Sequence, residues 1–457
     1  MLPALRFLSL LVAGNLGLFA ATAPANSDRI VVMISVDGLA GYYLDDPKAE
    51  MPNIRALAAE GARAKSMKAT TPSVTWPNHT TLVTGVAPAK HGVTGNNYFD
   101  RAAGKRVTLI ADPVFDKDQI VKVPTIYDAA KAVGLKTAAI RWPATRNARS
   151  LDWTMPDVGT GALLKQYSTP SLVAECARAG LTLDQFSKDQ VPENQQEGMD
   201  GKYTRAFNLI LREHRPNLAL LHIINVDHTQ HSHGPKSEEA YAAIKENDQL
   251  VGEVWSELKR GFPNQATLIV VSDHGFSPIN RMILPNVMLK NAGLLKEAEA
   301  KREGDVFVLP QGGSAFLYIR NEAKRAELLR QVRQVFTGVE GVTKVVGANE
   351  FKKYGVADPK SDPHAPDLIL FAGLGYAFGD TSAGAIPFQD KPERRGTHGH
   401  DPNIPELHAM FVAWGTGIKP GSRIGGISNL DVAPTIARLL GIPYPADGKV
   451  LTKILAR

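Results

Sequence analysis

Seven residues in separated segments of this chain carry the side chains that a two-metal phosphoryl-transfer site needs. Carboxylate oxygens and imidazole nitrogens are ligands typical of zinc, and an alcohol beside a metal ion can act as a nucleophile. The chain has no clustered thiolates, so a catalytic rather than a structural metal site is expected. The candidates are Asp37, Thr75, Asp227, His231, Asp273, His274 and His398.

Three apolar runs that resemble parallel strands end in these metal-type ligands. In an open parallel sheet the carboxyl ends of the strands share one edge, so ligands far apart in sequence can converge there. We therefore expect one site at one edge of the sheet. The runs are IVVMISVDG, LALLHIINVDHTQH and TLIVVSDHG.

The individual ligand segments differ in how specific they are. Asp227 and His231 are four residues apart, so a helical turn places both on one face, where they can bind one ion. Asp37 precedes a glycine, which by itself is only a common turn signal. Asp273 and His274 close an apolar strand, and His398 lies in a loop before another strand. Together these segments favour a metal site more than any of them does alone.

Thr75 has two interpretations. It precedes an amphipathic stretch, and a threonine at that place is often an N-cap whose hydroxyl satisfies the first turn of a helix. A hydroxyl there also lies in the positive end of the helix dipole, and a bound metal ion could activate it as a nucleophile. This segment alone favours the capping interpretation.

The elements that must position these residues alternate between short apolar strands and amphipathic helices. The alternation predicts an α/β fold with a doubly wound, mostly parallel sheet between helices. Glycines mark the ends of several expected helices. Helical patterns occur in MPNIRALAAEGA, TIYDAAKAVG, SEEAYAAIKENDQLVGEVWSELKR and LDVAPTIARLLG, and strand patterns in KTAAIRW and HAMFVAWG.

Two stretches interrupt the alternation. Residues 144–200 are polar and are predicted to form an insertion over one face. Residues 279–395 contain strands and one helix before the last ligand segment, which predicts a smaller inserted α+β subdomain within a catalytic domain spanning 26–457.

Composition limits the function classes. The chain has 457 residues, of which 44% are hydrophobic and 21% charged, so it can bury a large core. Its net charge of +6 is modest and dispersed, which suits anionic substrates. We expect a small-molecule phosphate ester as partner and no nucleic-acid scaffold, since no basic arm or binding motif is present. The sequence does not predict an oligomeric state.

Residues 1–25 have the pattern of a cleaved export signal. One arginine precedes a short apolar stretch, and a small-x-small site follows at Ala23 to Ala25. No later segment is apolar enough for a membrane span. The single cysteine, Cys176, excludes an intrachain disulfide, so we expect a bacterial periplasmic or secreted protein.

The chain resembles the nucleotide pyrophosphatase/phosphodiesterase family of the alkaline phosphatase superfamily. The Thr-Trp-Pro-Asn-His block with its following Leu-Val-Thr-Gly is the most specific match. The matching segments run in order from about residue 30 to 440: VVMISVDG, TPSVTWPNHTTLVTGVAPAKHGVTGNN, DHTQHSHGP, VVSDHGFSP and GTHGHDPNIPELHAMFVAWG.

The resemblance implies an alkaline phosphatase-like fold with two zinc ions per chain. Asp227, His231 and His398 would hold one ion, and Asp37, Thr75, Asp273 and His274 would hold the other. Thr75 would be the nucleophile of a covalent phosphothreonine intermediate. Asn96 would donate a hydrogen bond to a phosphoryl oxygen.

Substrate contacts follow from the resemblance less directly. Trp76 stands where nucleotide-binding members have a base-stacking aromatic residue. His222 stands where they tend to have a tyrosine, and we count it with Trp76 and Asn96 as a substrate-binding candidate. Arg141 or Arg146 could face a phosphate, although either could equally be a surface arginine.

The leading hypothesis is an exported zinc-dependent phosphodiesterase or nucleotide pyrophosphatase. The alternative enzyme is a phosphomonoesterase on the same metal centre. A non-catalytic metal-binding or phosphate-binding protein is the alternative outside the enzyme classes.

Overall fold

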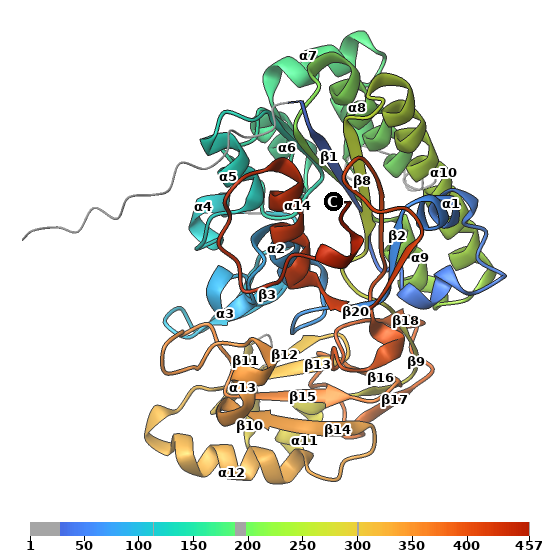
Figure 1. Ribbon diagram of the computed structural model, residues 1–457. Helices are drawn as coiled ribbons and strands as arrows, with labels where there is room; N and C mark the ends of the chain where they lie inside the picture. The colour runs from blue at the N-terminus through green and yellow to red at the C-terminus, as the bar shows by residue number, and fades with distance from the viewer. Residues whose placement is uncertain (1–27, 113, 188–197, 299–300, 457) are drawn as a thin grey trace, which may run out of the picture.

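The computed structural model describes residues 28–112, 114–187, 198–298 and 301–456 (Figure 1). The expected export signal at 1–25 lies outside these residues. Within them, no helix combines the length and apolar character required to span a bilayer.

Eight strands of the described chain form one large sheet. Its order is β20-β2-β19-β8-β1-β7-β5-β6, and every neighbouring pair is parallel except the two pairs that β19 makes. The strands are β1 (Ile30–Val36), β2 (Ala62–Lys68), β5 (Thr137–Ile140), β6 (Trp153–Met155), β7 (Leu218–Ile223), β8 (Ala266–Val271), β19 (Phe411–Gly415) and β20 (Ser422–Ser428).

Strand β1 shows why the sheet is buried on both sides. All seven of its residues are buried. Because side chains alternate between the two faces of a strand, Val32 and Ile34 join one hydrophobic core while Val31 and Met33 join another. Such a strand is stable only when helices cover both faces of the sheet.

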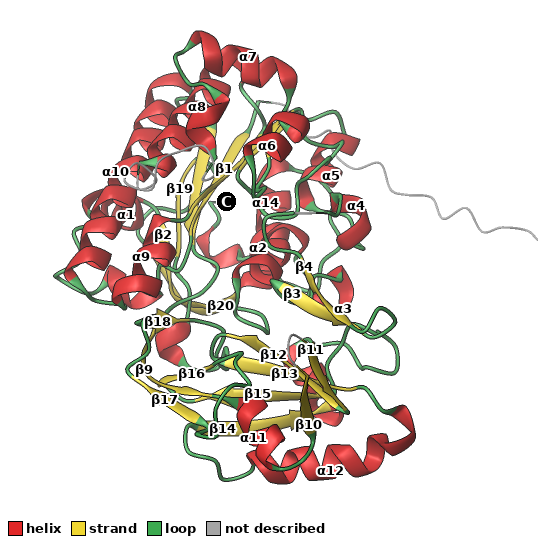
Figure 2. Cartoon of the chain, turned by 180° about the vertical axis from the view of Figure 1, so that it is seen from behind, coloured by secondary structure: helices red, strands yellow, loops and turns green. Residues whose placement is uncertain are grey.

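Helices lie on both faces of this sheet (Figures 1 and 2). On one face the core includes side chains of α1 (Pro52–Glu60), α6 (Gly161–Tyr167), α7 (Pro170–Arg178), α8 (Met199–His214) and α10 (Glu238–Gly261). On the other face it includes side chains of α2 (Thr75–Thr84), α5 (Ile126–Ala132) and α14 (Val432–Leu440). The predicted fold class, a mostly parallel sheet between helices, is confirmed.

Segment 144–200 contributes to the main sheet as well as covering it. Strand β6 pairs in parallel with β5 and forms the edge of the sheet. Helix α7 follows and buries Cys176 in the core of that face. The expectation of a simple insertion over one face was therefore incomplete.

Residues between β8 and β19 build separate smaller sheets with their own hydrophobic core, at the lower end in Figure 2. One sheet has the order β12-β13-β15-β14, a second has the order β16-β9-β17 with β18 also pairing with β9, and β10 pairs with β11 in a third. The elements are β9 (Ser277–Ile283), α11 (Pro285–Asn291), β10 (Leu295–Ala298), β11 (Lys301–Gly304), β12 (Val306–Gln311), β13 (Ser314–Ile319), α12 (Arg325–Phe336), β14 (Val342–Gly347), α13 (Phe351–Tyr354), β15 (Leu368–Ala372), β16 (Gly375–Phe378), β17 (Phe388–Asp390) and β18 (Gly396–Thr397).

The pairing of β9 with β18 determines where two ligand candidates meet. Ser277 lies opposite Thr397, so the chain leaves and rejoins the main domain at neighbouring points. His274 precedes β9 and His398 follows β18. The remaining described elements are α3 (Pro88–His91), β3 (Asn97–Asp100), β4 (Lys105–Thr108), α4 (Lys117–Ile120) and α9 (Asn225–His233).

Candidate active site

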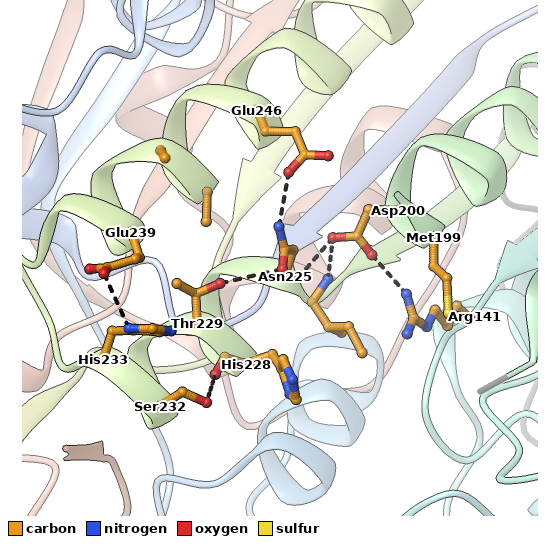
Figure 3. Close-up of a pocket in the computed structure, with 13 residues that line it drawn as sticks. Arg141, Met199, Asp200, Asn225, His228, Thr229, Ser232, His233, Glu239 and Glu246 are labelled. Carbon is orange, nitrogen blue, oxygen red and sulfur yellow. Dashed lines mark hydrogen bonds and ion pairs between the residues drawn. The ribbon is translucent and has the colours of Figure 1, made fainter. Parts of the chain in front are cut away.

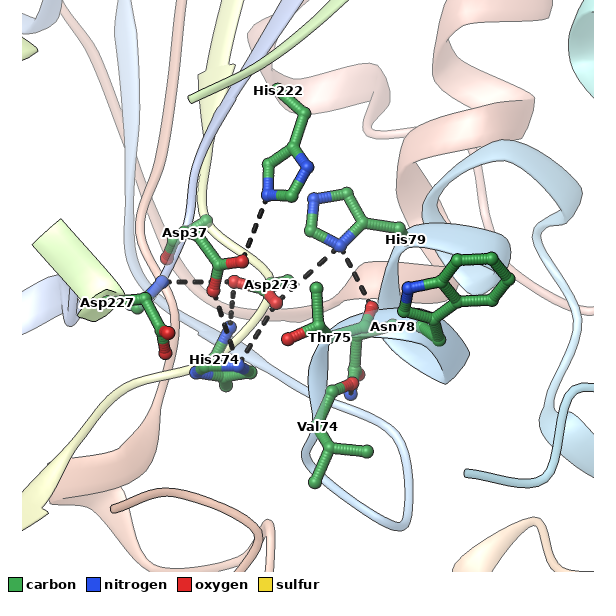
Figure 4. Close-up of polar contacts among 12 residues, drawn as sticks. Asp37, Val74, Thr75, Asn78, His79, His222, Asp227, Asp273 and His274 are labelled. Carbon is green, nitrogen blue, oxygen red and sulfur yellow. Dashed lines mark hydrogen bonds and ion pairs between the residues drawn. The ribbon is translucent and has the colours of Figure 1, made fainter. Parts of the chain in front are cut away.

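The first ligand cluster forms where β1 and β8 end side by side. Asp37 follows β1, and Asp273 and His274 follow β8. His274 Nε2 lies 3.1 Å from Asp273 Oδ2 and 3.5 Å from Asp37 Oδ1 (Figure 4). The Gly38 N–H donates a hydrogen bond of 3.1 Å to Asp273 Oδ1, which leaves Oδ2 toward the histidine. These three ligand atoms lie within 4.8 Å of one another, close enough to share one ion.

The second cluster lies beside the first and uses the start of helix α9. Asp227 Oδ1 lies 3.4 Å from His231 Nε2 and 3.5 Å from His398 Nε2. The His398 ring stacks on that of His274, with 3.6 Å between centroids. Asp227, His274 and His398 likewise offer ligand atoms within 4.8 Å of one another. The structure thus brings together residues that are more than 300 positions apart in the sequence.

Backbone carbonyl groups orient the three imidazole rings. Nδ1 lies 3.2 Å from the Gly275 oxygen in His274, 2.8 Å from the Gly396 oxygen in His231 and 3.0 Å from the Ser73 oxygen in His398. A carbonyl oxygen can only accept, so Nδ1 carries the hydrogen in His274 and His398, and in His231 when its Nε2 binds a cation. The Nε2 lone pairs therefore face the carboxylates, as they do in metal-ligating histidines.

Thr75 is the first residue of α2, and Figure 4 shows its hydroxyl pointing toward Asp273 and His274. The N-cap residue is Val74, and no side chain caps this helix. The Thr75 hydroxyl makes no hydrogen bond to another residue of the described chain. The capping interpretation of Thr75 is therefore wrong, and the hydroxyl faces the first cluster.

Without a bound cation, burial shifts the pKa values of the carboxyl and imidazole groups in this site. It raises the pKa of the Asp37 and Asp273 carboxyl groups, and the nearby Asp227 carboxylate raises both further. Burial also lowers the pKa of His231 and of His398 to about 3, so both imidazoles are neutral ligands at neutral pH. Carboxylates this close stay ionised together only beside a compensating positive charge.

The buried atoms of the first cluster fit a divalent metal ion. Asp37 Oδ1, Asp273 Oδ2 and His274 Nε2 are buried without a hydrogen-bond partner in the described chain. Leaving buried polar atoms unsatisfied is costly, and metal coordination would satisfy all three. The donor set contains only oxygen and imidazole nitrogen, which suits zinc.

His222 takes a different place from the one predicted. It lies in β7, is 2% exposed, and its Nε2 lies 2.9 Å from Asp37 Oδ2. Its Nδ1 lies 3.0 Å from the Arg141 carbonyl oxygen. A ring enclosed in this way cannot contact substrate, so its assignment as a substrate-binding residue was wrong. His222 instead orients a ligand candidate.

We expect His222→Ala to weaken metal binding by roughly 10- to 100-fold, the usual effect of losing a partner that orients a metal ligand. Competition with a chromophoric zinc chelator measures the affinity. His222→Gln can still donate an N–H and should recover part of the loss. His233→Ala, which removes an exposed imidazole of α9, serves as the control. Unchanged zinc affinity in His222→Ala would refute this role.

Trp76 also differs from its prediction. Its side chain is fully buried and packs with Val93, Leu109 and Ile120. No face of the indole remains for stacking on a base, so this assignment was wrong. An aromatic residue after a nucleophile fits a ligand contact or a core position equally well, and the sequence could not separate the two.

The position of Asn96 is compatible with its predicted role as a hydrogen-bond donor to a phosphoryl oxygen. Its Oδ1 accepts a hydrogen bond of 2.9 Å from the Trp76 N–H, which ties Asn96 to the first turn of α2. Because the oxygen is used in this way, the amide N–H groups remain as donors. The side chain is half-buried.

Neither arginine candidate is an unpaired phosphate ligand. Arg141 is buried, and its Nη1 donates a hydrogen bond of 2.7 Å to Asp200 Oδ1. Arg146 Nε donates one of 2.9 Å to Asp116 Oδ1. Both cations are therefore already neutralised by carboxylates.

A polar cavity of about 520 Å³ lies on the other face of α9 (Figure 3). His228, Thr229 and Ser232 line it from this helix, while Asp227 and His231 occupy the helix face toward the other ligand candidates. Asn225 and Glu246 also line it, and Asn225 Nδ2 donates a hydrogen bond of 2.9 Å to Glu246 Oε2. The cavity is thus separate from the clustered ligands.

The sequence did not reveal that the inserted segment supports the site. The β12–β13 turn contacts the His398 loop, and the Gly313 N–H donates a hydrogen bond of 2.7 Å to the His398 oxygen. Gly312 has φ +75°, and a Cβ on it would lie 2.2 Å from that oxygen. Gln311 Nε2 also donates a hydrogen bond of 2.9 Å to the Asn97 oxygen, beside Asn96. In the sequence, only the Gly312-Gly313 pair could have indicated this contact, and such a pair is also typical of an ordinary turn.

The sequence of this chain is similar to those of known phosphodiesterases and pyrophosphatases. The family model described as type I phosphodiesterase/nucleotide pyrophosphatase matches residues 31–401. An uncharacterized pyrophosphatase/phosphodiesterase of Schizosaccharomyces pombe is 26% identical over 432 residues, covering 92% of this chain and 78% of that protein.

Other relatives are longer. The chain is 24% identical to a venom phosphodiesterase of Crotalus durissus collilineatus, covering 94% of this chain and 46% of that protein. It is 26% identical to human ectonucleotide pyrophosphatase/phosphodiesterase family member 1, covering 91% and 40%. The chain therefore spans less than half the length of these two relatives.

Solved structures share the fold. Human ectonucleotide pyrophosphatase/phosphodiesterase 5 superposes with a TM-score of 0.72 at 20% identity, covering 94% of this chain and all of that one. An inactive variant of the murine protein, solved with AMP, has a TM-score of 0.70 and the same identity.

Proposed function

The chain belongs to the type I phosphodiesterase/nucleotide pyrophosphatase family, and we propose that it is an exported, zinc-dependent hydrolase of phosphate diesters or pyrophosphate bonds. The observation that carries this proposal is the convergence of Asp37 Oδ1, Asp273 Oδ2 and His274 Nε2, buried and without hydrogen bonds in the described chain, beside the Thr75 hydroxyl. Such an arrangement suits a metal-activated alcohol nucleophile.

The donor set accommodates two ions. Asp37, Asp273, His274 and the Thr75 hydroxyl would hold one ion. The neighbouring side chains of Asp227, His231 and His398 would hold the other. When bound, zinc would lower the pKa of the coordinated hydroxyl and neutralise charge on the phosphoryl oxygens.

The residues of this chain perform the remaining steps. Thr75 Oγ loses its proton to solvent and forms a bond to phosphorus, while the bond from phosphorus to the leaving oxygen breaks and the leaving group departs with the electron pair. Asn96 donates an N–H to a non-bridging oxygen as negative charge accumulates there. Water then cleaves the phosphothreonine intermediate and restores the Thr75 hydroxyl.

Two observations favour a diester over a monoester. A dianionic monoester is best held by positive groups close to its phosphate, and the two arginines that the sequence offered for this role, Arg141 and Arg146, are both paired with aspartates. The family model and the printed names of the relatives point to the same class. A nucleotide is a reasonable substrate, because a murine relative was solved with AMP. Export to a bacterial periplasm or beyond remains part of this proposal.

A comparison of two chromogenic substrates tests the diesterase assignment. We expect kcat/KM for bis-p-nitrophenyl phosphate to exceed that for p-nitrophenyl phosphate by at least about tenfold, which corresponds to about 1.4 kcal/mol of transition-state stabilisation. The two substrates share a leaving group, so the ratio reports on the second substituent. A ratio in favour of the monoester would identify a phosphomonoesterase on the same centre.

A further inference from the structure

Arg394 lies at the edge of the second ligand cluster. Its Nε is 2.9 Å from His231 Nδ1. The backbone nearby is fixed, because the Arg395 N–H donates a hydrogen bond of 2.9 Å to the His231 oxygen and the Arg395 oxygen accepts one of 2.7 Å from Ile279. The place of Arg394 is therefore set by the same segments that position His231 and His398.

The contact between Arg394 and His231 cannot persist when His231 binds an ion. His231 Nδ1 also lies 2.8 Å from the Gly396 oxygen. With Nε2 used as a ligand, Nδ1 carries the hydrogen and donates it to that oxygen. The Arg394 Nε–H then has no acceptor on His231, and among the described residues no other acceptor is bonded to the guanidinium beside the ligand cluster.

Arg394 also has no carboxylate partner within the described ranges. Arg141, Arg146 and Arg281 each pair with an acidic side chain, whereas Arg394 has no such ion pair. Its side chain is exposed, so a ligand entering from solvent can reach it. A free cation beside the ion ligands is suited to an anionic part of the substrate.

The position of Arg394 relative to Thr75 indicates which anionic part of the substrate Arg394 would contact. Thr75 faces the cluster of Asp37, Asp273 and His274. Phosphoryl transfer places the attacking and leaving oxygens roughly in line, so the leaving group lies away from Thr75, toward the Asp227 cluster. Arg394 stands on that side, in contact with His231.

We propose that Arg394 binds an anionic group carried by the leaving group, so that the site prefers phosphoanhydrides to diesters with an uncharged leaving group. A guanidinium offers several N–H donors in a planar fork that matches phosphate oxygens. The inference rests on the proposed function and assigns a specificity-determining residue to it.

Paired substrates test this role. Arg394→Gln should lower kcat/KM for release of pyrophosphate from ATP by roughly 10- to 100-fold, the effect of losing a hydrogen bond to a charged group. Hydrolysis of bis-p-nitrophenyl phosphate should change by less than about threefold. Arg394→Lys should recover part of the loss. Lys391→Gln, which removes an exposed cation three residues earlier, should change neither rate.

An equal fall for both substrates, or no fall for ATP, would overturn the proposal. Calorimetric titration of zinc-loaded protein with inorganic pyrophosphate provides a readout that does not depend on turnover. Affinity should fall in Arg394→Gln at unchanged zinc content, and equal affinity would overturn the role of Arg394. If the wild type cleaves neither substrate, the proposed function fails, but the titration still decides whether Arg394 binds the anion.

Discussion

Replacing Thr75 with alanine is expected to reduce phosphodiester hydrolysis by roughly four orders of magnitude, because the nucleophile itself is removed. The hydroxyl is neither a helix cap nor a hydrogen-bond donor to another residue within the described ranges, so the variant should fold normally. Initial rates with bis-p-nitrophenyl phosphate measure the effect. Zinc content and thermal unfolding measure whether the site and the fold are intact.

Thr75→Ser is the matched variant, because it keeps the hydroxyl and removes only a methyl group. It should retain measurable activity and form a covalent phosphoserine intermediate. Thr80→Ala, on the same helix, removes a hydroxyl that bonds to the Trp76 carbonyl at 2.9 Å and should leave the chemistry intact. If Thr75→Ala is as active as the wild type, the covalent mechanism is excluded, and a non-catalytic interpretation of Thr75 returns.

Removal of metal is expected to abolish activity and to destabilise the protein, most strongly above neutral pH. The folded pKa of Asp37 and of Asp273 is raised by burial, to about 8 for Asp273, so without a cation the folded protein holds protons there that the unfolded chain releases. Stability of the metal-free protein therefore falls as pH rises toward the raised folded pKa, by up to about 1.4 kcal/mol per pH unit for each proton that unfolding releases.

The pH window separates this effect from that of the buried histidines. His231 and His398, with pKa lowered to about 3, cost stability only as pH falls below their unfolded value of 6.5. Between pH 6.5 and 8.5 the difference in melting temperature between zinc-loaded and metal-free protein should widen. Restoring zinc should recover activity, with Mg²⁺ as the control ion. A difference that is constant across this window, or full activity after chelation, would contradict the account.

The sequence was sufficient to predict that the ligand candidates at the strand ends lie together, because these residues obey a general rule of parallel sheets. Asp37, Asp273 and His274 each follow a buried β-branched run, and such runs end at one edge of the sheet. The spacing of Asp227 and His231 fits the helix α9 that carries them. These local patterns account for the fold class and for the convergence of the first cluster.

Long-range contacts account for what the sequence could not provide. His222 and Trp76 have side-chain types that suit a substrate pocket, yet one bonds to Asp37 and the other is fully buried. The approach of His398 to His274 depends on the pairing of β9 with β18, across more than a hundred intervening residues. No local spacing encodes that register.

Anomalous diffraction at the zinc edge from crystals of the zinc-loaded protein tests the central claim most directly. We predict two peaks about 3.5–4 Å apart, as in other two-metal sites. One should lie among Asp37, Asp273, His274 and the Thr75 hydroxyl, and the other among Asp227, His231 and His398. A single peak, or peaks away from these side chains, would contradict the two-metal account.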